Sequence, residues 1–305
     1  MSAAGVTLVL SGGGAKTAAH VGAVRAIAEA RLAPLRYVAT SMGAVVAAAL
    51  AGGADREAVL GRLAEAGRAG VARDPLALVR GLFARSLLRA APFRRAIEQL
   101  VPARRFADLS LPITVSVVDL DSGELLLFGE GGEDAPLVDV LCASCALPVY
   151  FPAVKLAGRR CGDGGLRGPL PLDVAARLAR EMVVAVDVGP GFDTVDAGGR
   201  VILSGAKEAI RGHGLLRFAQ DDILGTPLRA APPIVRAHDD TVGALMANAT
   251  AAQLALWRAD PGRPALVYVR PRVERSATFR VDRVRQYADD GYRATREALA
   301  AAGRP

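Results

Sequence analysis

The sequence predicts an α/β layered fold with a mainly parallel central sheet. Short apolar runs bounded by glycine and proline alternate with longer segments of helical pattern, and this alternation is typical of a parallel sheet covered by helices. With 305 residues, of which 51% are hydrophobic, the chain can bury one substantial core. We therefore expect a single domain over residues 1–305.

Apolar runs and breaker residues define the individual elements. The predicted strands are Val6–Leu10, Tyr37–Ala39, Ile113–Asp119, Glu124–Gly129, Val154–Leu156, Arg159–Cys161, Met182–Val188 and Ala265–Val269. The predicted helices are Thr17–Arg31, Met42–Leu50, Asp55–Gly70, Asp74–Leu100 with a break at Pro92, Leu137–Ala146 and Val281–Ala302. Gly189–Arg200 and the pair Pro232-Pro233 are predicted as loops. Met42–Leu50 is apolar on all sides, which favours a helix at the centre of the domain.

A candidate nucleophile, Ser41, lies between a predicted strand and this buried helix. Small residues surround it in the run Ala39–Gly43 and let the backbone make a sharp turn that exposes the hydroxyl. The amide of Met42 comes next, in the first turn of the helix, where it could donate to an oxyanion. A nucleophile elbow normally begins with glycine, and Ala39 stands in that place. On this motif alone, a serine that caps a buried helix is the favoured interpretation.

A glycine-rich loop at Ser11–Lys16 strengthens the catalytic interpretation. Gly12, Gly13 and Gly14 expose backbone amides just before a predicted helix, which makes a site for an anionic oxygen. The oxygen could belong to an oxyanion or to a phosphate. The phosphate-loop spacing and the dinucleotide fingerprint are both incomplete, because required glycines are missing. We therefore favour an oxyanion loop and keep nucleotide binding as the alternative.

Asp163 is the candidate base. It follows a predicted hairpin and precedes Gly164 and Gly165, so an ordinary Asp-Gly turn is the alternative. His20 is expected to pack within the first helix, and His213 and His238 are expected at the surface. A partly desolvated carboxylate that is hydrogen-bonded to a serine can replace histidine as the base.

These blocks occur in an order that resembles the patatin-like phospholipase family. The order is a glycine loop, the x-x-S-x-G run at Ser41, an Ala-Ser-x-x-x-Pro segment at Ala143–Pro148, and Asp163-Gly164-Gly165. The resemblance implies a three-layer α/β/α fold, with a motif-bearing core at about 5–190 that residues 191–305 complete. It also implies hydrolysis of lipid acyl esters by a Ser41–Asp163 dyad without a histidine. No cofactor is expected.

Within that resemblance, oxyanion donors are expected around Gly12, Gly13, Gly14, Lys16 and Met42, supported by Ala39, Gly43, Gly164 and Gly165. Two residues depart from the family pattern. Ala39 replaces the first elbow glycine, and Thr17 replaces the glycine that usually follows the basic loop residue. A catalytically weak or inactive lipid-binding module is therefore the alternative function.

Charge and cysteine content limit the partners. The net charge of +7 is spread along the chain with only 5% aromatic residues, which argues against nucleic-acid binding. Three cysteines without a signal-like start fit a reducing compartment, so a cytoplasmic location is expected. Cys142 and Cys145 have no second ligand pair at zinc spacing, and no metal site is assigned.

The segment Leu76–Phe106 is basic, with seven arginines interleaved with apolar residues at helical spacing. Helices of this kind can lie on anionic membranes. We expect peripheral membrane contact here, with a lid helix that has a solvated basic face as the alternative.

Overall fold

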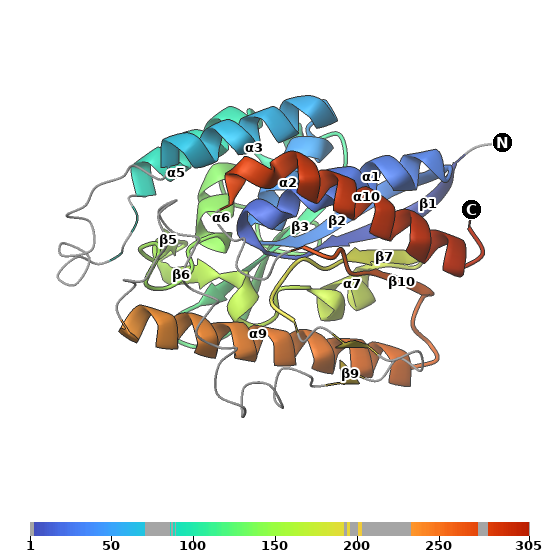
Figure 1. Ribbon diagram of the computed structural model, residues 1–305. Coiled ribbons are helices and arrows are strands. Elements are labelled where there is room, and N and C mark those ends of the chain that lie inside the picture. Colours follow the sequence, from blue (N-terminus) through green and yellow to red (C-terminus); the bar gives the residue numbers. More distant parts are fainter. Residues whose placement is uncertain are drawn as a thin grey trace.

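The computed structural model describes residues 3–70, 86, 88, 90–191, 194–195, 201–202, 233–273 and 280–304. Figure 1 shows a central sheet between helices. The strands are β1 (Ala4–Leu10), β2 (Leu32–Thr40), β3 (Ile113–Asp119), β4 (Leu125–Gly129), β5 (Val154–Leu156), β6 (Arg159–Asp163), β7 (Val183–Val186), β8 (Thr194–Val195), β9 (Val201–Ile202) and β10 (Leu266–Val269). The α-helices are α1 (Ala18–Glu29), α2 (Met42–Ala51), α3 (Arg56–Gly70), α5 (Ala90–Leu100), α6 (Leu137–Ser144), α7 (Leu172–Leu178), α9 (Pro233–Ala259) and α10 (Val284–Ala301). Short 3₁₀ turns are η1 (Gly14–Thr17), η2 (Phe106–Asp108), η3 (Gly164–Leu166) and η5 (Val281–Arg283).

The main sheet has a parallel centre and an antiparallel end. Its strand order is β10-β7-β1-β2-β3-β6-β5, and β4 pairs with β3. The pairs among β10, β7, β1, β2 and β3 are parallel, whereas β4, β5 and β6 pair antiparallel. The carboxyl ends of β10, β7, β1 and β2 therefore meet at one edge, where parallel α/β sheets place their sites.

Helices cover both faces of this sheet (Figure 1), so the predicted three-layer α/β/α fold is confirmed. The alternation of side chains along β1 explains the two covered faces. Leu8 and Leu10 belong to the larger buried cluster, which includes α1, α2 and α10. Val9 points into a second cluster with Leu172 of α7 and Trp257 of α9.

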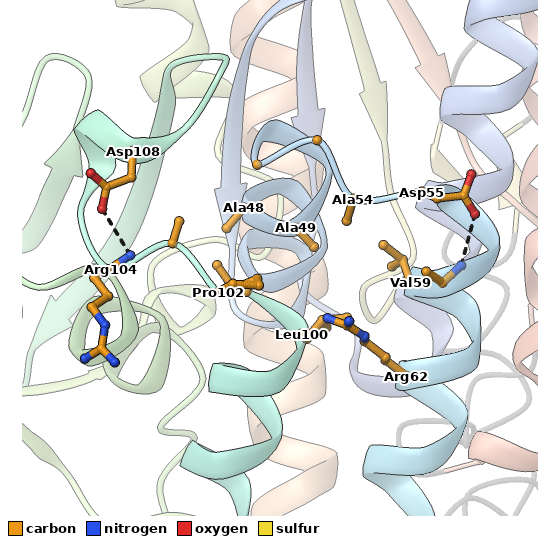
Figure 2. A pocket seen from close by; sticks show the side chains of 15 residues that line it. Ala48, Ala49, Ala54, Asp55, Val59, Arg62, Leu100, Pro102, Arg104 and Asp108 are labelled. Carbon is orange, nitrogen blue, oxygen red and sulfur yellow. Dashed lines mark hydrogen bonds between the residues drawn. The ribbon is translucent and has the colours of Figure 1, made fainter.

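A cavity of about 570 Å³ lies among the end of α2, the start of α3 and the end of α5 (Figure 2). Its apolar wall includes Ala48, Val59 and Leu100, and Arg62 is among its polar residues. Neither Ser41 nor Asp163 lines it. Seven residues of helix, or about 10 Å, separate Ser41 from Ala48, so we do not assign this cavity to the candidate dyad.

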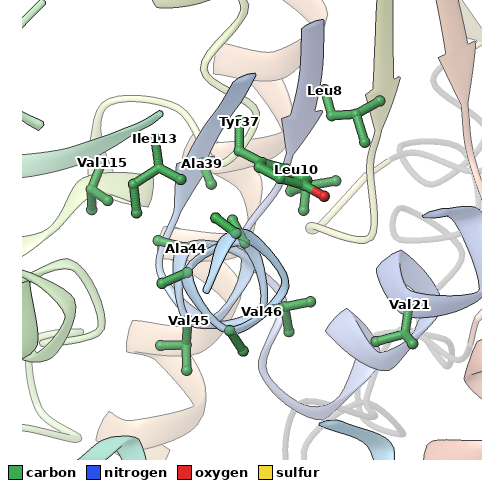
Figure 3. Close-up of a cluster of buried hydrophobic side chains, with 14 of the residues drawn as sticks. Leu8, Leu10, Val21, Tyr37, Ala39, Ala44, Val45, Val46, Ile113 and Val115 are labelled. Atoms are coloured by element: carbon green, nitrogen blue, oxygen red, sulfur yellow. The ribbon is translucent and has the colours of Figure 1, made fainter. Parts of the chain in front are cut away.

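The predicted buried helix corresponds to α2 (Figure 3). Val45 and Val46 are completely buried, and Tyr37 of β2, in the same hydrophobic cluster, is 2% exposed. Within the described ranges, no helix combines the length and apolarity needed to cross a membrane.

Three differences between the predicted and the observed elements involve prolines. β2 is longer than the predicted Tyr37–Ala39, and the β1–β2 register shifts next to Pro34. The predicted helix Asp74–Leu100 does not continue through Ser86 and Leu88, so its interruption lies before α5 and not at Pro92 itself. Pro92 fits in the first turn of α5, where no helical amide is required. The predicted loop at Pro232-Pro233 is wrong at Pro233, which begins α9.

Glycines allow α1 and α10 to cross closely. A Cβ added to Gly22 would lie 1.8 Å from Ala288 O, and one added to Gly291 would lie 2.0 Å from Ala19 O. Both neighbours are backbone atoms in helices, so neither can move cheaply to make room. These two contacts fix the position of the C-terminal helix on the first.

We expect Gly291→Ala to lower the free energy of unfolding by about 3 kcal/mol, because overpacking forces the two helices apart. The matched control is Gly61→Ala in α3, where an added Cβ meets nothing within 4 Å. Alanine is the better helix former, so this variant should match the parent or gain up to about 1 kcal/mol. Urea titrations of all three proteins measure the difference. Equal midpoints for Gly291→Ala and the parent would contradict the packing argument.

Candidate active site

Ser41 occupies a sharp turn between β2 and α2. Its φ of 55° and ψ of −137° lie outside the regions that L-residues usually adopt, at a cost of about 1–3 kcal/mol. Two hydrogen bonds hold this backbone. The Ser41 amide donates to Ser144 Oγ at 2.8 Å, and the Ser41 carbonyl accepts the Ala44 amide at 2.9 Å. The strained serine is thus fixed from both sides, as a nucleophile elbow requires.

Ala39 and Gly43, on either side of the turn, differ in whether the position requires glycine. Ala39 is in β2, has no positive φ and is completely buried in the core (Figure 3). Its methyl group therefore introduces no backbone strain at the place of the usual glycine. Gly43 cannot be replaced so easily, because an added Cβ would lie 2.3 Å from Ser11 O.

Strand β3 brings Asp163 to Ser41. Thr40, the last residue of β2, pairs with Ser116 of β3, and Asp163, the last residue of β6, pairs with the next β3 residue, Val117. β6 therefore begins to pair with β3 where β2 stops. Two residues 122 positions apart in sequence meet because they occupy adjacent places along one strand.

The contact between them is a short buried hydrogen bond. Ser41 Oγ donates to Asp163 Oδ2 at 2.7 Å, and the Gly165 amide donates to Asp163 Oδ1 at 2.7 Å. Asp163 is only 4% exposed. Burial raises the pKa of its carboxyl from 3.8 to about 6, and the hydrogen bonds from Gly165 and Ser41 act in the opposite direction.

Ser144 belongs to the same network, although no role was predicted for it. Its hydroxyl accepts the Ser41 amide and donates to Ser116 O at 2.8 Å. Ser116 Oγ in turn hydrogen-bonds Thr40 Oγ1. Ser144 thereby connects the strained turn to β3. Its place in the Ala143–Pro148 block was the available signal, but spacing alone does not reveal a partner 103 residues away.

The glycine loop packs directly against the candidate nucleophile, Ser41. A Cβ on Gly12 would lie 3.0 Å from Ser41 Cβ, and one on Gly13 would lie 2.9 Å from Val188 O. The Gly12 amide donates to Pro169 O at 3.0 Å and so is used within the fold. Gly14 has a φ of 60°.

In the described part of the chain, the amides of Gly13 and Gly14, unlike that of Gly12, are not used within the fold. Among the described residues, no hydrogen bond uses the amides of Gly13, Gly14 or Met42. These amides are therefore available to a ligand.

The remaining candidate residues lie next to Asp163 or next to the glycine loop in the sequence, and they support these two turns. Gly164 approaches β3, since an added Cβ would lie 2.3 Å from Ser116 O. Lys16 is 3% exposed within η1. Thr17, the other departure from the family pattern, is completely buried, and its hydroxyl donates to Gly14 O at 2.6 Å.

Neither of the two described histidines, His20 and His238, takes part in the Ser41–Asp163 contact. Of the described histidines, His20 is buried as expected and bonds Ser11 O. His238 is half-buried on α9 and contacts Asp239. His213 lies outside the described residues. No group of three or more His, Cys, Asp or Glu side chains in the described part of the chain could hold a metal ion.

The sequence model of the family described as "Patatin-like phospholipase" matches residues 8–176, more than half of the chain. The chain belongs to the patatin-like phospholipase family. The resemblance seen in the four ordered sequence blocks is thus confirmed.

Patatin-like relatives with curated names match a similar part of the chain. An uncharacterised NTE family protein of Mycobacterium bovis is 30% identical over 194 residues, covering 62% of this chain and 51% of that protein. Patatin-like phospholipase domain-containing protein 7 of Rattus norvegicus is 28% identical over 196 residues, covering 62% of this chain and 14% of that protein. The match thus spans about half of the mycobacterial protein and a small part of the rat protein.

Among solved structures, VipD from Legionella pneumophila is similar over 99% of this chain and 67% of that chain, with 16% identity and a TM-score of 0.47. We draw nothing further from that likeness.

Proposed function

We propose that this patatin-like protein is a serine acyl hydrolase that cleaves carboxylic esters of lipids, of phospholipase A or lysophospholipase type. The observation that carries the proposal is the 2.7 Å hydrogen bond from Ser41 Oγ to the buried Asp163 carboxylate. Membership of the family supports a lipid ester as substrate.

In the proposed reaction, Ser41 Oγ attacks the ester carbonyl carbon while its proton passes to Asp163 Oδ2. The carbonyl oxygen becomes an oxyanion, which accepts hydrogen bonds from the amides of Gly13, Gly14 and Met42. When the tetrahedral intermediate collapses, the carbon–oxygen bond to the alcohol breaks and Asp163 returns the proton to that oxygen. Water then attacks the acyl-enzyme with Asp163 again as the base, releasing the fatty acid and restoring Ser41.

The alternative is a catalytically weak or inactive lipid-binding module. This alternative was suggested by the two departures from the family pattern, Ala39 and Thr17. Ala39 adds no strain, and the Thr17 hydroxyl braces Gly14, so neither favours the alternative. Nucleotide binding at the glycine loop would leave the Ser41–Asp163 contact without a purpose.

We expect Ser41→Ala to lower turnover of a short-chain p-nitrophenyl ester by about 10⁴-fold or more. A fluorophosphonate probe should label the parent protein stoichiometrically and leave the variant unlabelled. Ser110→Ala, a change of an exposed serine away from the dyad, is the matched control and should keep both properties. Equal turnover in the Ser41→Ala protein would refute the proposal, and a folded parent that resists labelling would favour the inactive module.

Activity should follow the ionisation of Asp163, which accepts a proton only as the carboxylate. Because its pKa is raised to about 6, kcat/KM should reach half its maximum near pH 6 and fall about tenfold per pH unit below it. An ester whose product signal does not depend on pH measures the profile between pH 4.5 and 8. A profile without an acid limb in this range would show that Asp163 is not the base.

We further propose a cytoplasmic protein that contacts anionic membranes through the basic segment Leu76–Phe106. Residues 76–85, 87 and 89 of this segment lie outside the described residues. In the described part, Arg94 and Arg105 pair with carboxylates. Arg95 and Arg104 are exposed and form no ion pair with a described residue, so they can face anionic lipid.

Vesicle sedimentation tests this contact. The protein should bind vesicles of phosphatidylcholine with phosphatidylserine more than pure phosphatidylcholine vesicles, and less as salt is raised. Arg95→Glu combined with Arg104→Glu should reduce binding by about thirtyfold or more, since two basic residues at about 1 kcal/mol each are lost. Arg56→Glu combined with Arg304→Glu changes the net charge equally at other exposed sites and should have a smaller effect. Equal losses in both double variants would contradict a specific surface. Recovery outside the cytoplasmic and membrane fractions of cells would contradict the location.

A further inference from the structure

A second buried polar cluster lies at the same sheet edge as the dyad, where β7 and β10 end. Asp187 follows β7 and is 1% exposed. Its Oδ2 accepts hydrogen bonds from Tyr268 Oη at 2.8 Å and pairs with Arg270 Nη1 at 2.5 Å. Its Oδ1 accepts the Gly189 amide at 2.9 Å, while Arg270 Nη2 donates to Gly189 O at 2.9 Å. Three hydrogen bonds and one ion pair thus fix this turn.

This turn supports the glycine loop. Val188, between Asp187 and Gly189, donates its amide to Ser11 Oγ at 2.8 Å. Its carbonyl lies 2.9 Å from the place of a Cβ on Gly13. Any shift of Val188 would therefore move Ser11 and Gly13 together.

His20 holds the same loop from the opposite side. It projects from α1, is completely buried, and its Nε2 lies 2.8 Å from Ser11 O. A carbonyl can only accept, so Nε2 carries the proton. Burial lowers the pKa of the ring to about 4, which leaves it neutral at physiological pH. Nδ1 then has a buried lone pair without a hydrogen-bond partner among the described residues, which costs free energy.

We propose that His20 and the Asp187–Arg270 pair are positioning residues, which orient the peptide groups of Ser11–Gly14 so that the amides of Gly13 and Gly14 face Ser41. The inference rests on the proposed hydrolase function. Both oxygens of Ser11 accept hydrogen bonds, the carbonyl from His20 and the hydroxyl from the Val188 amide. Because oxyanion donors act only when they are held in place before the reaction, these two hydrogen bonds should contribute to kcat more than to KM.

The test uses variants that keep or remove one contact. His20→Leu removes the donor to Ser11 O, whereas the amide of His20→Gln can still donate from nearly the same place. Arg270→Lys keeps the charge but cannot contact Asp187 and Gly189 O together. Arg36→Lys is the matched control, since Arg36 forms a half-buried ion pair with Glu130 toward the opposite edge of the sheet.

Active sites are counted by fluorophosphonate labelling taken to completion, so that misfolded protein does not enter kcat. We expect His20→Leu to lower kcat per labelled site by about 10–100-fold and Arg270→Lys by about tenfold, with KM changed less than about threefold. His20→Gln should recover most of the loss, and Arg36→Lys should retain the parental kcat. The acid limb near pH 6 should stay in place, because Asp163 is untouched.

Parental kcat per labelled site in His20→Leu and Arg270→Lys would overturn the inference, even with lower melting temperatures. A shifted acid limb would also overturn it, since the dyad itself would then be disturbed. If His20→Leu yields no folded protein, Arg270→Lys decides between the two results. A parent protein without any turnover would instead defeat the proposed function, so the two failures are distinguishable.

Discussion

The hydrogen-bonding edge of β3 determines where the candidate dyad can form. One edge of this strand pairs first with β2 and then with β6, so that Thr40 lies opposite Ser116 and Asp163 opposite Val117. A register slip of one residue would turn side chains to the other face of the sheet. The Ser41–Asp163 hydrogen bond is therefore a consequence of strand pairing as much as of the two side chains.

The sequence predicted the parts of this arrangement that depend on local chemistry. Apolar runs ending in glycine or serine gave the strand ends, and the apolar character of Met42–Leu50 gave the buried helix that became α2. Gly43 was predicted as part of the turn at Ser41. The structure gives the reason for a glycine here, because α2 starts directly against the end of β1. The contact between Ser41 and Asp163 was inferred instead from the order of the sequence blocks, which resembles the family. The number of residues between two positions does not show how far apart they lie in the fold.

Contacts between distant segments could not be predicted in this way. Ser144 reads as an ordinary helix residue until its hydroxyl is seen between the Ser41 amide and Ser116 O. α9 was missed because it starts with a proline and its buried residues, Met246, Thr250, Leu254 and Trp257, mix apolar and polar types. Their spacing of four, four and three residues is nevertheless a helical stripe, and it was the available signal.

Burial of Asp163 has opposite effects before and during the proposed reaction. Removal from water penalises the carboxylate, and among the described residues only the Gly165 amide and the Ser41 hydroxyl donate to it. The same removal favours the neutral acid, which is the form that Asp163 takes when Ser41 attacks. The negative charge then passes to the substrate oxygen beside the amides of Gly13 and Gly14. In the proposed reaction, charge thus moves from a place where burial disfavours it to one where fixed dipoles stabilise it, and this would allow a carboxylate to act as the base without histidine.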